Sequence, residues 1–243
     1  MMDSISERQK RTRLLLGDDL ARLQNAHVLV LGVGGVGAYA AEQLGRAGIG
    51  TLTLVDGDDI EPSNCNRQLP ALTSTLGLPK AEVMADRLKE INPAVKVLTR
   101  NEFIEGGKIP QLLDSGFDFM IDAIDSLTPK VEFLLEARRR KIPLVSSMGA
   151  GGRMDPSLIT VADISKTHGC ALARAVRSRL REHGVSRGLK VVFSPEPVPK
   201  SAIESTVDSR GKFRSTVGTI SYLPAIFGCI CASVVIRGLL SRE

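Results

Sequence analysis

A run of glycines between an apolar segment and a stretch of small, helix-forming residues limits most strongly what this chain can fold into. Residues 27–31 read HVLVL and stop at Gly32-Val-Gly-Gly-Val-Gly37, as a buried strand of a parallel sheet does at a tight turn. Residues 35–47 predict a helix that Gly48 ends, and residues 51–55 (TLTLV) predict a second strand. Strand, turn, helix and strand form a βαβ unit, whose right-handed crossover places both strands in one parallel sheet.

The same alternation continues along most of the chain. Helices are predicted from Pro79 to Asn92, over residues 128–141 and over residues 170–183, and strands at 95–99, 117–121, 144–147, 158–161 and 191–193. The fold class is therefore α/β: a Rossmann-like, mostly parallel sheet with helices on both faces, followed by a C-terminal extension of mixed strands and an apolar helix. We expect one domain over residues 1–243, with residues 166–215 as an insertion-like part.

The C-terminal segments differ from the rest in composition. Residues 194–215 are rich in proline, serine and charge, and we predict a mobile loop there. Residues 216–236 contain no charge and are long enough to span a bilayer. Pro224, Gly218 and Gly228 dilute their hydrophobicity, however, and small residues allow close backbone approach. We therefore predict a helix buried in the core or in a dimer interface rather than a membrane span.

Charge is distributed unevenly along the chain. The whole chain carries +5, whereas residues 166–214 alone carry eleven basic and four acidic side chains. Such asymmetry fits an anionic partner on one face, or a solvated surface that keeps the protein soluble. Trp is absent and aromatics make up 4% of the residues, so any RNA binding would depend on charge and shape rather than on stacking.

The cysteines point to a reducing compartment. Four cysteines in a chain of 243 residues do not predict a disulfide framework, and no secretory signal opens the sequence. We expect a cytoplasmic protein with reduced thiols. Cys170, at the start of the basic helix, could accept sulfur from a sulfur-transfer partner, but a bystander thiol is the commoner role.

The glycine run also predicts a nucleotide site. Gly32, Gly34, Gly35 and Gly37 would let backbone N–H groups approach a phosphate at a helix N-terminus. Asp56, which follows the second strand, is suitably placed to accept hydrogen bonds from ribose hydroxyls. These features alone fit a nicotinamide-dependent oxidoreductase as well as an ATP-binding enzyme.

Two cations and a second acid favour ATP. Asn64, Arg67 and Gln68 follow Asp56, and Lys80 stands at the start of the next helix. An arginine and a lysine in one crevice would neutralise a triphosphate and its departing pyrophosphate. Asp125 follows the strand ending in Ile121-Asp122, and its carboxylate could hold Mg²⁺ against the phosphates. A monovalent cation is a further possibility that the sequence leaves open.

Together, these motifs resemble the adenylation domain of the ubiquitin-activating superfamily, which includes the ThiF, MoeB and HesA proteins. The resemblance implies a homodimer with Asp56 on the ribose, Arg67 and Lys80 on the phosphates, and Asp125 on magnesium. It also implies that Arg11, in the segment Lys10-Arg11-Thr12, reaches into the partner's ATP site. The other interpretation of Arg11 is a solvated basic arm.

Within this superfamily the chain resembles the tRNA threonylcarbamoyladenosine dehydratases. The likeness runs from residues 11–17 through 121–126 and continues in 149–156 and 163–167. It implies adenylation of a carboxylate on a tRNA adenosine, followed by intramolecular ring closure. The main alternative is adenylation of the C-terminus of a ubiquitin-like sulfur carrier, but the two zinc-binding CxxC pairs of such activators are missing. A nucleotide-gated binding module without turnover is a third possibility.

The basic helix supplies a candidate RNA surface. Arg174, Arg177 and Arg181 fall at i, i+3 and i+7, one face of a helix. Such a row can follow an RNA phosphate backbone, so we predict that these three residues contact tRNA. The alternative is an ordinary solvent-facing surface.

Overall fold

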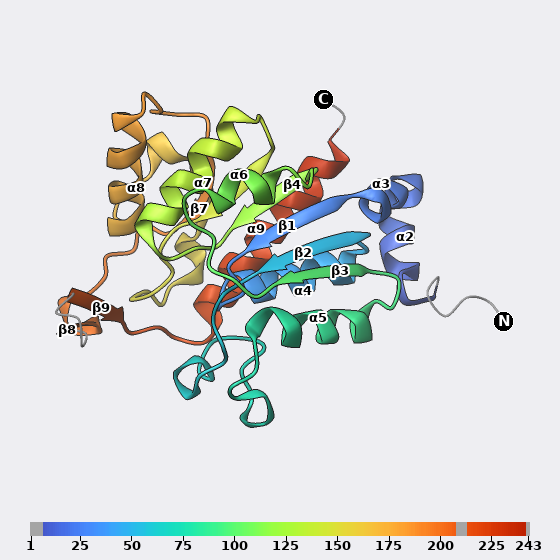
Figure 1. Ribbon diagram of the computed structural model, residues 1–243, viewed down its shortest axis with the longest axis horizontal. Helices are drawn as coiled ribbons and strands as arrows, with labels where there is room; N and C mark the ends of the chain where they lie inside the picture. The colour runs from blue at the N-terminus through green and yellow to red at the C-terminus, as the bar shows by residue number, and fades with distance from the viewer. Residues whose placement is uncertain (1–6, 208–212, 242–243) are drawn as a thin grey trace.

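The computed structural model describes residues 7–207 and 213–241, and its centre is a seven-stranded sheet (Figure 1). The strands lie in the order β3-β2-β1-β4-β5-β7-β6, and all neighbours are parallel except β6 and β7. The strand order reverses between β1 and β4, and ligands of open sheets bind beyond the carboxyl ends at such a point. The bounds are β1 His27–Leu31, β2 Thr51–Val55, β3 Lys96–Arg100, β4 Phe119–Asp122, β5 Leu144–Ser147, β6 Thr160–Asp163 and β7 Lys190–Phe193.

Helices cover both faces of the sheet. One face packs against α4 (Gly37–Ala47), α5 (Lys80–Ile91) and α9 (Tyr222–Leu240), the other against α6 (Lys108–Leu113), α7 (Leu127–Arg139) and α8 (Ala171–Glu182). Along β1, Val28 and Val30 join the first cluster, whereas Leu29 and Leu31 join the second. Burial on both faces explains why this strand is apolar throughout. The predicted α/β class with helices on both faces is confirmed.

Two short helices lead into the sheet. α2 (Lys10–Leu16) and α3 (Leu20–Asn25) lie beside the starting ends of the strands (Figure 1). Arg8, just before α2, donates hydrogen bonds to the carbonyls of Glu90 and Ile91 at the C-terminus of α5. This N-terminal segment is therefore anchored near the end of the sheet at which the strands begin, opposite the end that carries the glycine run.

Most of the uncharged C-terminal segment lies in α9, which is the one helix in the described residues long and apolar enough to cross a membrane. Here it packs against α4 and the sheet, and its side chains Leu223, Phe227, Cys231 and Val235 are fully buried. A Cβ on Gly228 would overlap the carbonyl oxygen of Val36, so the glycine lets the two backbones approach closely. The prediction of a core helix is confirmed in this fold.

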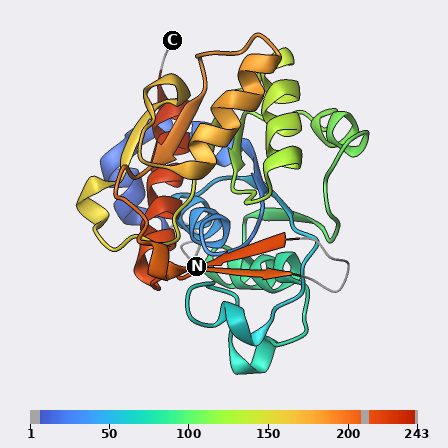
Figure 2. The same ribbon diagram turned by 90° about the vertical axis from the view of Figure 1, so that its left-hand side faces the viewer.

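The structure differs from the mobile loop predicted over residues 194–215. The chain instead forms the antiparallel strands β8 (Ile203–Val207) and β9 (Phe213–Val217), which stand apart from the main sheet (Figures 1 and 2). The segment was predicted as a loop because it is rich in polar residues, and its two strands pair with each other rather than with the central sheet. Upstream, β7 lies between β5 and β6, so it belongs to the central sheet. Arg210 and Lys212, two of the eleven basic residues counted in residues 166–214, lie outside the described residues.

Some predicted boundaries also shift. The helix expected from residue 35 begins at Gly37, because residues 32–36 form the turn. The strand expected at 158–161 begins at Thr160, because Pro156–Leu158 is a 3-10 turn capped by the side chain of Asp155. Proline and an Asx cap both favour a turn over an extended chain.

Candidate nucleotide-binding site

The glycine loop closes tightly between β1 and the N-terminus of α4. Gly32 has a positive φ of 90° and lies against the connection that follows β4. A Cβ there would lie 2.8 Å from the carbonyl oxygen of Ala123. A Cβ on Gly37 would overlap the carbonyl oxygen of Gly32. Only glycine therefore fits at these two positions, and the turn presents its N–H groups where the positive end of α4 favours a phosphate.

Asp56 joins the end of β2 to this loop. One carboxylate oxygen, Oδ2, accepts a hydrogen bond from the Val33 N–H at 2.6 Å, and Oδ1 accepts one from the Asp58 N–H at 2.9 Å. Burial raises the pKa of Asp56 above its ordinary value, and these hydrogen bonds together with the charge of Lys80 partly oppose that shift. The carboxylate is held beside the loop with lone pairs left for ribose hydroxyls.

Lys80 enters the crevice from the first residue of α5. It is only 5% exposed, and its Nζ lies 2.9 Å from Oδ2 of Asp58, whose side chain is largely exposed. A buried ammonium needs a counter-charge, and Asp58 supplies it when no phosphate is present. Asp58 was not predicted as a site residue, although an acid only two residues after Asp56 could have indicated it.

Arg67 and Gln68 line the other side of the glycine loop. A Cβ on Gly35 would lie 3.5 Å from Cγ of Arg67, and one on Gly34 would lie 3.8 Å from Nε2 of Gln68. The Arg67 guanidinium donates to the Ser63 carbonyl and to Oδ1 of Asn66, each at 2.9 Å. Asn64 is occupied locally, because its Oδ1 accepts from the Glu61 N–H in a capping box.

Asp125 lies three residues beyond the end of β4, in a connection that contacts the glycine loop through Ala123. Ala123, two residues earlier, contacts Gly32 and donates its N–H to the Leu31 carbonyl at 2.8 Å. Asp125 is exposed, and its Oδ1 accepts a hydrogen bond from the Ser126 hydroxyl at 3.3 Å. The acid is therefore free to bind an additional ligand at this edge.

These residues fit a nucleoside triphosphate together with magnesium. Oε1 of Gln68 is buried and has no hydrogen-bond partner among the described residues, so the site offers a polar group that a ligand can satisfy. No group of three or more His, Cys, Asp or Glu residues that could hold a metal occurs in the described chain. Mg²⁺ commonly uses only one or two carboxylates plus phosphate oxygens, which matches a site with Asp125 as its protein ligand.

The arginines of α8 do not behave alike. Arg174 and Arg181 are exposed, and neither takes part in an ion pair within residues 7–207 and 213–241. Arg177 is half-buried and donates to the carbonyl oxygen of Thr167 at 2.8 Å and to its hydroxyl. Arg177 thus ties the middle of α8 to the segment that precedes the helix, a role that the helical spacing did not reveal.

A buried arginine organises the loop that follows β5. Arg153 is 3% exposed and donates to the carbonyls of Gly149 (2.6 Å) and Glu196 (3.1 Å). A Cβ on Gly149 would lie 3.7 Å from both Arg153 Nη1 and Cys170 Sγ, so the thiol lies close to this loop. Cys170 is 4% exposed and packs in the apolar cluster on the α7 side of the sheet. Burial limits its access to a sulfur donor.

Arg11 is not brought to the crevice of its own chain. It is exposed on α2, at the sheet edge where the strands begin, whereas the glycine loop lies at the opposite edge (Figure 1). Any contact between Arg11 and ATP therefore requires a second copy of the chain.

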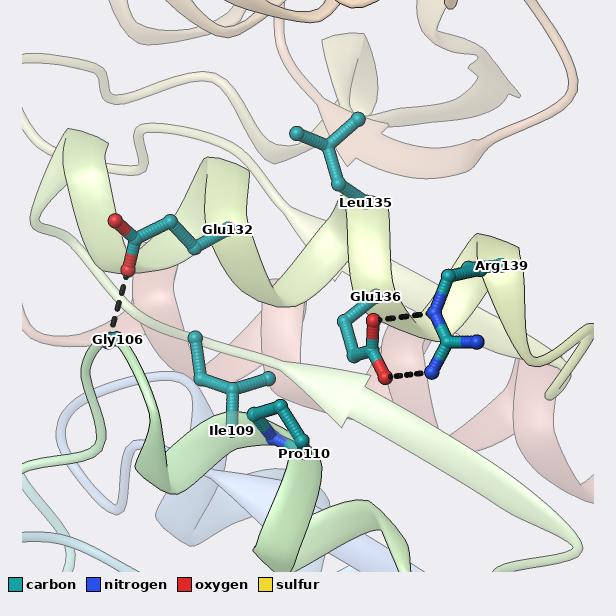
Figure 3. Close-up of a pocket in the computed structure, with 7 residues that line it drawn as sticks. All are labelled: Gly106, Ile109, Pro110, Glu132, Leu135, Glu136 and Arg139. Carbon is teal, nitrogen blue, oxygen red and sulfur yellow. Dashed lines mark hydrogen bonds and ion pairs between the residues drawn. The ribbon is translucent and has the colours of Figure 1, made fainter.

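One cavity lies away from all of these residues. It measures about 310 Å³, lies between the start of α6 and the outer face of α7, and contains the ion pair of Glu136 with Arg139 (Figure 3). Its lining includes no residue that the sequence analysis singled out. The candidate nucleotide-binding residues lie instead on the loops that follow β1, β2 and β4 and at the start of α5.

The fold and the crevice agree with comparisons to known proteins. The ThiF family model matches residues 7–243. The tRNA threonylcarbamoyladenosine dehydratase of Bacillus subtilis is 39% identical over 237 residues, which cover 95% of this chain and 93% of that protein. The Escherichia coli protein of the same name is 38% identical over 257 residues, covering 99% and 96%. The crystal structure of the E. coli enzyme, TcdA, in complex with ATP matches with a TM-score of 0.89 at 36% identity, covering 99% and 97% of the two chains. The chain therefore belongs to the ThiF family.

Proposed function

We propose that this protein uses ATP to activate the carboxylate of threonylcarbamoyladenosine in tRNA and then closes a ring with net loss of water. The observation that carries the proposal is the crevice itself: Asp56, Lys80 and Gln68 surround a glycine loop whose glycines cannot be replaced without a clash at Gly32 and Gly37. The relatives that match nearly the whole chain are named for this reaction.

The first step forms an acyl-adenylate. A carboxylate oxygen of the substrate attacks the α-phosphorus of ATP, the bond to the β-phosphate oxygen breaks, and pyrophosphate leaves. Lys80 and Arg67 stabilise the negative charge that develops on the phosphates, and Asp56 orients the ribose. Magnesium, held by Asp125 when bound, would supply further charge neutralisation.

The second step needs no nucleophile from the protein. The carbamoyl nitrogen of the same modified base attacks the activated carbonyl, loses its proton, and AMP departs. A tethered nitrogen has a high effective concentration, so positioning is sufficient. One thiol is unsuited to such a role in any case: Cys231 is fully buried, and burial raises its pKa to about 12.

Three parts of the proposal extend beyond the crevice. The exposed arginines Arg174 and Arg181 bind the tRNA backbone, Arg11 completes the site of the partner in a homodimer, and the protein acts in the cytoplasm. The separation of Arg11 from its own crevice fits a dimer in which Arg11 of one copy reaches the ATP of the other.

Pyrophosphate exchange into ATP tests this reaction against its main competitor. We expect labelled pyrophosphate to enter ATP when tRNA carrying threonylcarbamoyladenosine is added, because the adenylate forms reversibly. Unmodified tRNA should give no exchange. Exchange stimulated by a ubiquitin-like sulfur carrier, and not by the modified tRNA, would contradict the proposal.

A further inference from the structure

A fully buried ion pair lies directly behind the nucleotide crevice. Nζ of Lys130, on α7, lies 2.8 Å from Oδ2 of Asp122, the last residue of β4, and both side chains are 0% exposed. The hydroxyl of Ser146, on β5, donates to the same oxygen at 2.6 Å. Neither Lys130 nor Ser146 has a role in the reaction described above.

The pair fixes the backbone that leads to Asp125. The other oxygen of Asp122 accepts a hydrogen bond from the Ile124 N–H at 3.0 Å, and Lys130 donates to the Ile124 carbonyl at 2.7 Å. Both polar groups of residue 124 are thus held by the two charged partners. Ala123, between them in the chain, packs on Gly32. These contacts restrict the connection from β4 to α7 at the residue just before Asp125.

Stability alone does not account for this pair. Removing two charges from water costs several kcal/mol per ion, and apolar side chains of similar size often stabilise a core equally well. The surroundings are suited to such a replacement, because the neighbouring α9 side contributes buried apolar groups, including Cys231. The charged partners instead provide directional contacts at the one connection that carries Asp125.

We propose that Asp122, Lys130 and Ser146 are positioning residues that hold Asp125 in place for magnesium-bound ATP. The inference rests on the proposed assignment of Asp125 to magnesium. Groups that orient a metal ligand are worth about 10–100-fold in metal affinity when they are removed.

The test uses ATP and Mg²⁺ alone. The paired variant Asp122→Asn with Lys130→Met removes both charges, so it leaves no unpaired ion in the core. We expect ATP affinity measured by calorimetry without Mg²⁺ to stay close to that of the unaltered protein. The gain in affinity on adding Mg²⁺ should fall by about 10-fold or more. Hydrogen exchange of the peptide covering residues 122–126 should become faster in the same variant.

Ser146→Ala provides a milder second variant, since it removes a single hydrogen bond and keeps the ion pair. It should lose part of the Mg²⁺-dependent gain while the protein remains fully folded at the temperature of the measurement. Arg140→Met, at the far end of α7, removes a charge that pairs with Glu136 and Asp114 and should leave the gain unchanged.

Asp125→Ala separates the assignment of Asp125 to magnesium from the positioning role of the buried residues. A full Mg²⁺-dependent gain in Asp125→Ala would overturn the assignment of that residue. Loss in Asp125→Ala combined with a full gain in both Ser146→Ala and the folded paired variant would overturn the positioning role. Because no tRNA is present, failure of the proposed tRNA reaction would leave this measurement valid.

Discussion

The nucleotide crevice and the α8 surface both contain cationic side chains, but the surroundings of these side chains differ. In the crevice Lys80 is 5% exposed and paired with Asp58, and Asp56 is tied to the glycine loop. On α8 Arg174 and Arg181 are exposed. A crevice of fixed, paired groups suits stabilisation of one reacting phosphate, whereas exposed arginines suit loose contact with a long polyanion. The difference indicates that chemistry and substrate affinity reside in separate regions, and substitutions should separate them.

Lys80→Ala should have the largest effect. Loss of one preorganised charge at a reacting phosphate costs about 10²–10³-fold in turnover. We expect a loss of that size in ring closure, measured by nucleoside analysis, with unchanged tRNA affinity in filter binding. Lys89→Ala, on the exposed part of the same helix, is the matched control and should retain activity. A parallel loss of tRNA affinity in Lys80→Ala would break the proposed separation.

Arg174→Glu with Arg181→Glu should produce the next largest effect, on the other region. Each lost phosphate contact lowers the slope of log affinity against log salt by about one. We expect weaker tRNA binding, a flatter salt dependence and unchanged ATP affinity. Arg139→Glu changes charge on the outer face of α7 and serves as the comparison. An unaltered salt slope in the double variant would remove α8 from the tRNA surface.

Arg177→Met distinguishes a structural arginine from the exposed arginines of the same helix, because Arg177 lies on α8 but is hydrogen-bonded to Thr167. Its loss leaves a carbonyl and a hydroxyl without their charged donor, which costs about 1–3 kcal/mol of unfolding free energy. We expect lower stability in urea denaturation and a smaller change in tRNA affinity than for the exposed pair. Undiminished stability with a large loss of tRNA binding would instead return Arg177 to the tRNA surface.

The smallest expected effect is a displacement in pH. Burial raises the pKa of Asp56 above its ordinary value of 3.8, and the ionised form is the better acceptor for ribose hydroxyls. As the pH falls, Asp56 takes up a proton earlier than an ordinary carboxyl, so ATP affinity should decline at a higher pH than an unshifted aspartate would give. Calorimetry between pH 4 and pH 7 measures the midpoint, and Asp56→Asn should remove this step. A midpoint at or below the ordinary value would contradict the assignment.

The sequence predicted the crevice better than the interactions that support it. Gly32, Gly37 and Asp56 were identifiable because a turn after a buried strand admits few residue types, and the spacing then places the acid beside the turn. Lys130 was not, because a lysine in a mixed helix is most often exposed and nothing in the local pattern reveals its partner on β4. Tertiary contacts between distant segments decide its role.

The same reason explains the other differences. Arg177 matched a helical spacing, but its tie to Thr167 depends on how the preceding segment folds back. The hairpin of β8 and β9 was missed because its polar composition resembles a loop and its strands pair only with each other. Local composition describes such segments poorly when pairing, rather than burial, holds them.

In the proposed reaction, this crevice activates a carboxylate on tRNA and closes it into a ring. To test this, the protein is incubated with ATP, Mg²⁺ and tRNA carrying threonylcarbamoyladenosine. The tRNA is then digested, and the masses of its nucleosides are measured by mass spectrometry. We predict that the modified nucleoside loses the mass of one water molecule, with one AMP released for each nucleoside converted. A modified nucleoside of unchanged mass, with ATP bound and the protein folded, would contradict the account.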